Sequence, residues 1–345
     1  MESSWIDTED WHTAGEPFRI VEHLPPGHLP DGQSVAQRRL TILQSANHPL
    51  DTLRKTLCHE PRGHADMYGG FIVPPDDPGA HFGVLFWHKD GFSTACGHGT
   101  IALGYWAINK GLVKVPDGEG HVDVKIDVPS GRVVATMAVK SGKIVHADFV
   151  NVASYQLAQG IEVNLESRNT KIQVDLSFGG AVYASVDATA LGLRVEPGSY
   201  HSFVALGREI KAALGRRAHY GDYDLYGVIF FNDETGTEAD EDMITQRNVT
   251  VFADGQIDRS PCGSGTCARV AILHAQGRIG AGKSKLLHYS IVGSAFVADI
   301  RSDTQSPIEN FPACIPRVRG NANLVGRMSF FLDPTDPVFP GFVFR

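Results

Sequence analysis

"CGHGTIALGYWAINKG" at residues 96–111 aligns without a gap with "CGSGTCARVAILHAQG" at residues 262–277. The two segments share the cysteine, both glycines of Gly-x-Gly, the threonine, one alanine and the closing glycine, in one register of 166 residues. In each segment an apolar run with helical spacing follows the glycines, which predicts a helix that begins just after the cysteine. The offset is close to half of the 345-residue chain, so we interpret the pattern as a duplication that produced two similar domains.

The rest of the chain is dominated by patterns that predict strands. Alternating or continuously apolar segments recur from the first residues to the last, whereas helical spacing is confined to a few stretches. We expect helices at residues 34–60 and 199–214 and after each of the two cysteines. Many strands with few inserted helices predict an α+β fold rather than a regular alternation of strands and helices.

The length of the chain suggests two domains. We assign residues 1–155 and the tail 325–345 to a first domain that carries Cys96, and residues 156–324 to a second that carries Cys262. The stretches at 185–203 and 253–263 are rich in Gly, Pro and Asp, which predicts connecting loops.

Composition excludes several classes of protein. The net charge is −8 and no long run of Lys or Arg occurs, so we expect no nucleic-acid partner. No apolar run approaches the roughly 18 residues of a membrane span, and the first residues lack the pattern of a signal peptide. The five cysteines are an odd number, thinly spread, which is typical of free thiols in a reducing compartment. We therefore expect a cytoplasmic protein without a membrane partner.

The position of the cysteines has chemical consequences. The first N–H groups of a helix lack partners within the helix and, with the helix dipole, favour an anion such as a carboxylate. The same field stabilises a thiolate, so Cys96 and Cys262 are candidate acid/base or nucleophilic groups. Two such thiols at one substrate suit a specific task, in which one removes a proton from a carbon and the other protonates its opposite face.

Other interpretations of the cysteines are weaker. Cys58, Cys267 and Cys314 lack the glycine context, and we expect them to be packed as small apolar residues. A zinc site lacks a second pair of ligands beside Cys262 and Cys267, and a phosphate-binding loop lacks the final Gly-Lys-Ser/Thr. A Cys-His hydrolase would leave the second cysteine unexplained.

Several segments resemble the proline racemase family, which includes proline racemases, hydroxyproline 2-epimerases and trans-3-hydroxyproline dehydratases. The resemblance rests on "CGHGT" at Cys96 and "DRSPCGSGT" at 258–266, and it extends over nearly the whole chain. Further similar segments follow in the family's order: "HTAGEPFRI" (12–20), "EPRGHADMYGG" (60–70), "SFGGAVYA" (177–184) and "GSAFVADI" (293–300). The resemblance implies a diaminopimelate-epimerase-like fold of two pseudo-symmetric domains, with the active site in the cleft between them. It also implies neither a metal nor another cofactor.

Carried over position by position, the resemblance makes Cys96 and Cys262 the two acid/base residues. Asp258, together with His98, would hold the ring nitrogen of a small imino acid, which is the implied partner of the protein. The other substrate-binding positions that it implies are Gly97, His98, Gly263 and Ser264 at the carboxylate, Tyr68 and Phe252 as aromatic walls, and Tyr226 near the substrate. We expect His64 and Asp66 to make structural hydrogen bonds outside the site.

The reaction itself is less sharply indicated. In the dehydratase branch a threonine typically replaces the second cysteine, so Cys262 favours a racemase or epimerase of proline or hydroxyproline. By contrast, "GFSTACGHGTIALG" (91–104), Ser264 and "DPVFPGFVFR" (336–345) are closer to the dehydratase branch. We therefore keep trans-3-hydroxyproline dehydratase as the alternative, and a non-catalytic imino-acid binder as a lesser one. A homodimer, common in the family, is compatible with the sequence.

Overall fold

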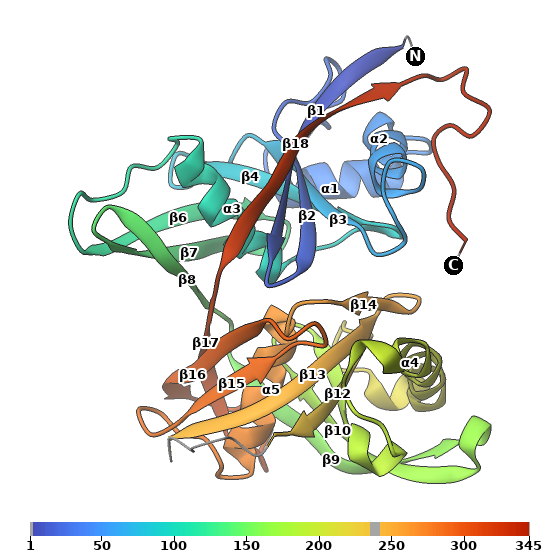
Figure 1. Ribbon diagram of the computed structural model, residues 1–345, viewed down its shortest axis with the longest axis vertical. Helices are drawn as coiled ribbons and strands as arrows, with labels where there is room; N and C mark the ends of the chain where they lie inside the picture. The colour runs from blue at the N-terminus through green and yellow to red at the C-terminus, as the bar shows by residue number, and fades with distance from the viewer. Residues whose placement is uncertain (1–2, 235–241, 345) are drawn as a thin grey trace. The chain divides into compact units, whose positions relative to one another are not determined.

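The computed structural model describes residues 3–234 and 242–344, and the chain separates into two compact units (Figure 1). The first unit comprises residues 1–147 and 321–345, and the second comprises residues 148–320. Each unit consists mostly of strands with a few helices, which confirms the α+β prediction.

The unit boundaries differ from the division that we expected from sequence, at 155/156 and 324/325. Residues 148–155 belong to the second unit, where the Asp148 carboxylate pairs with Arg319 at 2.8 Å and Tyr155 pairs with Ala313. Ala322 instead pairs with Thr13, so the segment after residue 320 returns to the first unit.

In the first unit the strands pair in the order β18-β1-β2-β3-β4-β6-β7. The β2–β3 and β4–β6 pairs are parallel and the others are antiparallel. Two short helices precede β3, and a third, α3, follows β5. The bounds are β1 (Ser4–Thr13), β2 (Glu16–Val21), α1 (Val35–Gln44), α2 (Pro49–Cys58), β3 (Tyr68–Val73), β4 (Phe82–His88), β5 (Gly91–Phe92), α3 (Gly97–Asn109), β6 (Gly120–Val128), β7 (Gly131–Lys140), β8 (Lys143–Val150, across the boundary) and β18 (Ala322–Leu332).

In the second unit the pairings close on themselves, in the order β9-β10-β11-β12-β13-β15-β16-β17 and back to β9. The β11–β12 and β13–β15 pairs are parallel and the others are antiparallel. The bounds are β9 (Ser154–Leu165), β10 (Thr170–Phe178), β11 (Val182–Asp187), α4 (Tyr200–Leu214), β12 (Leu225–Asp233), β13 (Met243–Phe252), β14 (Gln256–Asp258), α5 (Gly263–Ala275), β15 (Lys285–Tyr289), β16 (Ala295–Thr304) and β17 (Ala313–Gly320).

The two units share one topology. From β1 to β7 and from β10 to β16, antiparallel and parallel pairs follow in the same sequence, and each series contains one helix between its fifth and sixth strands. These two helices, α3 and α5, have 13 residues each and begin at Gly97 and Gly263. The internal repeat seen in the sequence is therefore confirmed in the fold.

The closing glycine of each repeat ends its helix. Gly111 and Gly277 have φ values of +73° and +70°, which glycine adopts without strain. The N–H of each glycine donates to the carbonyl three residues earlier at 2.9 Å, and the next N–H donates to the carbonyl five residues earlier at 2.9 Å. This is the Schellman arrangement, and it satisfies carbonyls that the end of a helix leaves free.

The helices α3 and α5 are buried in the cores of their units. Nearly every residue from Gly263 to Leu273 is buried, and α5 contacts β9, β10, β16 and β17. A helix that is apolar on all sides is stable only when protein surrounds it.

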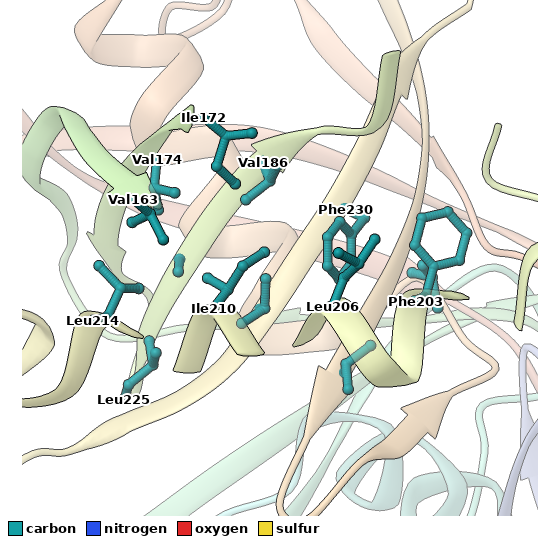
Figure 2. Close-up of a cluster of buried hydrophobic side chains, with 14 of the residues drawn as sticks. Val163, Ile172, Val174, Val186, Phe203, Leu206, Ile210, Leu214, Leu225 and Phe230 are labelled. Atoms are coloured by element: carbon teal, nitrogen blue, oxygen red, sulfur yellow. The ribbon is translucent and has the colours of Figure 1, made fainter. Parts of the chain in front are cut away.

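In the second unit α4 packs one apolar face against the sheet (Figure 2). That face consists of Phe203, Leu206, Ile210 and Leu214, against strand residues such as Val163, Val174, Leu225 and Phe230.

Two local expectations were wrong. The predicted helix at 34–60 is two helices, because Pro49 begins α2 and Asn47 before it has a φ of +58°. A proline is well placed at the first turn of a helix but cannot continue one from before. The predicted loops also contain regular structure. Residues 256–258 form β14, paired with β13, and 185–203 includes the end of β11, two short 3₁₀ turns and the start of α4.

Candidate active site

Cys96 is the residue that caps the N-terminus of α3. Its Sγ atom accepts a hydrogen bond from the N–H of Gly99 at 3.2 Å, and its carbonyl accepts from the N–H and the hydroxyl of Thr100 at 3.0 and 2.8 Å. A Cβ atom at Gly99 would lie 2.9 Å from this sulfur. The second glycine and the threonine of the motif therefore fix the thiol against the first turn of the helix.

His98 lies beside this thiol. Its Nδ1 atom is 3.3 Å from the Cys96 sulfur, and its main-chain carbonyl accepts a hydrogen bond from the Thr13 hydroxyl at 2.8 Å. Burial lowers the pKa of His98 to about 3, partly opposed by a hydrogen bond to the Pro17 carbonyl. The imidazole is consequently neutral near pH 7, and it can offer a lone pair as well as an N–H.

The predicted aromatic wall of the first unit lies next to His98. The Tyr68 ring is 5.0 Å from the imidazole, centroid to centroid, in an edge-to-face arrangement. The Tyr68 hydroxyl hydrogen-bonds the Ser93 hydroxyl, and Phe18 stacks against the ring at 6.3 Å. Gly97, the first residue of α3, contributes one of the N–H groups that have no acceptor within a helix. All four positions predicted in this unit thus cluster.

Cys262 occupies the N-cap position of α5, as Cys96 does in α3, but its backbone conformation differs. Its φ is +64°, a region that non-glycine residues occupy at a cost of order 1–3 kcal/mol, whereas the φ of Cys96 is −156°. The Cys262 carbonyl accepts from the N–H of Thr266 at 2.7 Å. A Cβ atom at Gly265 would lie 2.9 Å from the Cys262 sulfur, so the glycine has the same role in both motifs.

Asp258 stabilises the turn that leads to Cys262 through hydrogen bonds with Ser260. One carboxylate oxygen accepts from the N–H and the hydroxyl of Ser260 at 2.8 and 2.7 Å. The Ser260 oxygen in turn accepts from the N–H of Cys262 at 3.0 Å. Asp258 is at the end of β14, so a paired strand and not a free loop sets its position.

Burial shifts the pKa values of both Asp258 and Cys262. It raises the pKa of Asp258 to about 6, although the hydrogen bonds from Ser260 oppose the shift. Burial also raises the pKa of Cys262, and the neighbouring Asp258 carboxylate raises it further. Cys262 is therefore protonated near neutral pH.

The other predicted residues of the second unit form an aromatic cluster beside the thiol. The rings of Tyr226 and Phe252 are stacked, 5.8 Å apart with 4° between their planes. Tyr226 also meets Tyr183 edge to face at 5.5 Å. The Tyr183 hydroxyl lies 2.6 Å from the Ser264 oxygen and 3.8 Å from the Cys262 sulfur. Gly263 begins α5, as Gly97 begins α3.

Sequence reasoning missed Tyr183 and Ser260. Tyr183 belongs to "SFGGAVYA", which supported the resemblance, but a tyrosine in an apolar strand is usually a packing residue. Ser260 had a local signal, since a serine two residues after an aspartate often closes a side-chain turn. The structure also explains why a glycine stands at position 179, because a Cβ atom there would lie 2.4 Å from the Ser264 carbonyl oxygen.

The remaining cysteines are in the cores of the units. Cys58, Cys267 and Cys314 are free and buried, in agreement with a packing role. Within residues 3–234 and 242–344, no group of three or more His, Cys, Asp or Glu side chains is placed to hold a metal ion. Over the same residues, no helix is both long and apolar enough to cross a membrane.

The protein consists of two α+β units of one topology. Each unit has a buried cysteine at the start of one helix, α3 or α5, so the class is that of a duplicated protein with one cysteine motif in each half. The sequence profile of the proline racemase family matches residues 9–343. This chain belongs to the proline racemase family, and it is an enzyme of that family.

Relatives within the family carry out different reactions. A trans-3-hydroxy-L-proline dehydratase of Bacillus cereus is 38% identical over 344 residues, which cover 97% of each chain. A proline racemase of Clostridioides difficile is 34% identical over 350 residues, which cover 99% of this chain and 98% of that one. A hydroxyproline epimerase of Agrobacterium vitis, solved with bound trans-4-hydroxy-L-proline, superposes with a TM-score of 0.82 at 27% identity. The superposition covers 98% of this chain and 95% of that one.

Proposed function

We propose that this protein is a racemase or epimerase that inverts Cα of proline or a hydroxyproline by proton transfer between two cysteines. The observation that carries the proposal is the matched placement of Cys96 and Cys262. Each occupies the N-cap position of the buried helix of its unit, with a glycine three residues later that leaves room for the sulfur. The relative with bound trans-4-hydroxy-L-proline supports an imino acid as the substrate class.

In this proposal the substrate carboxylate is bound by N–H groups at the N-termini of α3 and α5. The N–H groups of Gly97, His98, Gly263 and Ser264 bind the carboxylate, aided by the positive ends of both helix dipoles. These donors also stabilise the negative charge that grows on the carboxylate as the Cα proton leaves. Asp258 and the neutral His98 hold the ring nitrogen, while Tyr68, Phe252 and Tyr226 pack against the ring.

The proton transfer balances without any further reagent. The Cys96 thiolate takes the Cα proton, and the electron pair of the C–H bond spreads into the carboxylate. The Cys262 thiol then gives its proton to the opposite face of Cα and becomes the thiolate. In the reverse direction the two cysteines exchange roles. The raised pKa of Cys262 supports its role as the initial donor.

A second candidate is dehydration of trans-3-hydroxyproline. It is favoured by the dehydratase relative at 38% identity. In that reaction Cys96 removes the same proton, the C–H electron pair forms a double bond between Cα and C3 as the C3–O bond breaks, and the proton that Cys96 has taken passes to the leaving oxygen to give water. A donor on the opposite face of Cα is therefore not needed. A non-catalytic imino-acid binder is the third possibility.

Three substrates distinguish these reactions. The protein is incubated in D₂O with L-proline, trans-4-hydroxy-L-proline and trans-3-hydroxy-L-proline, and the products are followed by NMR and polarimetry. An epimerase introduces deuterium at Cα with loss of optical purity. Ketimine formed only from the 3-hydroxy compound would identify a dehydratase. A mere binder would show no Cα exchange with any of the three.

Substitution of Cys262 tests the two-cysteine assignment. We expect Cys262→Ser to lower epimerisation about 10³-fold, because a general acid contributes typically 10²–10⁴-fold. Exchange of the Cα proton through Cys96 should survive in one epimer. Cys314→Ala, which removes a buried thiol that donates a hydrogen bond to the Ser154 carbonyl at 3.8 Å, is the matched control and should retain activity. A Cys262→Ser protein that interconverts both epimers at the wild-type rate would contradict the assignment.

The substitution Cys262→Thr tests whether the protein catalyses dehydration of trans-3-hydroxyproline once the second thiol is absent. It should retain Cα deprotonation by Cys96 and, with the 3-hydroxy substrate, permit dehydration. Its stability needs a parallel measurement, because a β-branched residue at a φ of +64° is strained. The absence of both exchange and dehydration in a folded Cys262→Thr protein would count against Cys96 as the base.

A further inference from the structure

Tyr183 joins two functional positions of the second unit that the sequence motif alone does not connect. It lies on β11 and is fully buried, and its hydroxyl is 2.6 Å from the Ser264 oxygen and 3.8 Å from the Cys262 sulfur. Its ring belongs to a small buried cluster with Ile229, Cys262 and Ala268. The phenol is therefore held in place by packing, with its polar end directed at the start of α5.

The first unit has a different arrangement at the matching position. His98 and Ser264 occupy the same place in the two repeats, 166 residues apart. His98 approaches its own cysteine directly, with Nδ1 3.3 Å from the Cys96 sulfur. Ser264 instead pairs with the Tyr183 hydroxyl, and it is this hydroxyl that reaches the Cys262 sulfur. Cys262 also interacts with the Asp258 carboxyl, which raises its pKa, and with the Thr250 side chain. The two thiols thus differ in their surroundings, and the contact with a phenol is specific to the second unit.

The hydroxyls of Tyr183 and Ser264 can each donate one hydrogen bond and accept others. When Cys262 is a thiol, its S–H has two acceptors within reach, the Asp258 carboxylate and the Tyr183 oxygen, and in either case Tyr183 donates to Ser264. When Cys262 is a thiolate, Ser264 donates to Tyr183, and Tyr183 donates to the sulfur. Both hydroxyls reverse direction by rotation alone, and no covalent bond is broken in the chain.

We propose that Tyr183 is a positioning residue that stabilises the thiolate of Cys262 and couples the protonation of that thiol to the direction of the Ser264 hydroxyl. The inference deepens the proposed function and rests on it for its role in turnover. When Cys262 is protonated, the Ser264 O–H is free to donate to the substrate carboxylate. When Cys262 has given up its proton, that donor turns back to Tyr183. Tyr183 also adds to the influences that lower the pKa of Cys262 against the effect of burial.

Alkylation of the thiols tests this inference without any substrate. Iodoacetamide reacts with the thiolate, so the rate at which each cysteine-containing peptide is modified, followed by mass spectrometry across pH, reports each thiolate separately. We expect Tyr183→Phe to slow the alkylation of Cys262 about tenfold at pH 8, the lower end of the effect of losing one hydrogen bond to an ionised group. The pH midpoint for Cys262 should rise, while the rate at Cys96 stays unchanged.

Tyr155→Phe is the matched control. It removes a partly buried hydroxyl of the same unit that donates to the Tyr220 hydroxyl at 3.2 Å, so it should alter neither alkylation rate. Equal slowing of Cys262 in Tyr155→Phe and Tyr183→Phe would overturn the inference, since it would indicate a general loosening of the unit. An unchanged Cys262 midpoint in a folded Tyr183→Phe protein would also overturn it.

A nearly isosteric replacement keeps the test decisive if Tyr183→Phe does not fold. Site-specific 3-fluorotyrosine at position 183 has a more acidic phenol, which is a stronger donor, and should speed alkylation of Cys262 alone. A decrease or no change would contradict the inference. Because these measurements need no turnover, they can succeed even where the D₂O experiment shows no Cα exchange. In that case the proposed function fails and the Tyr183 contact stands.

Discussion

The buried carboxyl of Asp258 makes stability depend on pH. Its pKa is raised in the folded protein, chiefly by burial, from the ordinary 3.8 to about 6. The folded state therefore holds this proton more tightly than the unfolded chain, and ionisation favours unfolding. The contribution of this group to the free energy of unfolding is fully present below about pH 4. It is lost as the pH rises toward 6.

We expect Asp258→Asn to raise the free energy of unfolding by about 1–3 kcal/mol at pH 7.5, because it removes this penalty. The amide oxygen can still accept the two hydrogen bonds from Ser260. At pH 4 the advantage should shrink below about 1 kcal/mol. Urea unfolding at both pH values measures the difference, and a variant less stable than wild type at pH 7.5 would contradict the account. Activity should be lost in the same variant.

At the scale of elements, two glycines of the α3 segment are needed for different reasons. Gly99 leaves room for the Cys96 sulfur, whereas Gly111 ends the helix. A Cβ atom at Gly99 would lie 2.6 Å from the Phe18 ring and 2.9 Å from the Cys96 sulfur. We expect Gly99→Ala to reduce kcat about 10²-fold, the effect of displacing a reacting group by roughly 1 Å.

Gly111→Ala is the contrasting change at the other end of the same helix. A Cβ there meets nothing within 4 Å, but the φ of +73° disfavours alanine. We expect a loss of about 1–2 kcal/mol in stability with kcat unchanged. Thermal melts and steady-state kinetics on both variants check the pair. Equal kcat values in the two proteins would refute the explanation of the motif.

The elements differed in how far sequence predicted them. The helices α3 and α5 were predictable because cysteine, glycines and closing glycine act within one segment. The strand at 256–258 was not, since its pairing with β13 outweighs a turn-like composition. Tyr183 was missed for a related reason, because its partner Ser264 is 81 residues away and no periodicity marks that contact.

At the scale of the whole molecule, the division of the sequence between the units predicts which fragments fold. The second unit is one continuous segment, 148–320, whose strand pairings close on themselves. Its closure was not predictable from sequence, because β9 and β17 meet from opposite ends of that segment. The first unit needs residues 321–345 as well as 1–147, since β18 pairs with β1 from Ser4 to Thr13.

We therefore expect the fragment 148–320 to fold alone, and the fragment 1–147 to remain unfolded. Joining 147 to 321 by a short Gly-Ser linker should restore the first unit, because the Asn321 side chain donates to the Val145 carbonyl at 2.8 Å and the ends lie close. Circular dichroism with thermal melts compares the three chains. A cooperative melt for 1–147 would show that β18 is not needed.

The pairing of β18 with β1 also bears on biosynthesis. A ribosome makes β1 before the whole second unit and its partner β18 after it. The second unit can fold during translation before β18 is made, whereas the first must wait for β18. A nascent chain will therefore present an unpaired β1 edge until β18 has been made. Such an edge is a target for chaperones and a risk for aggregation.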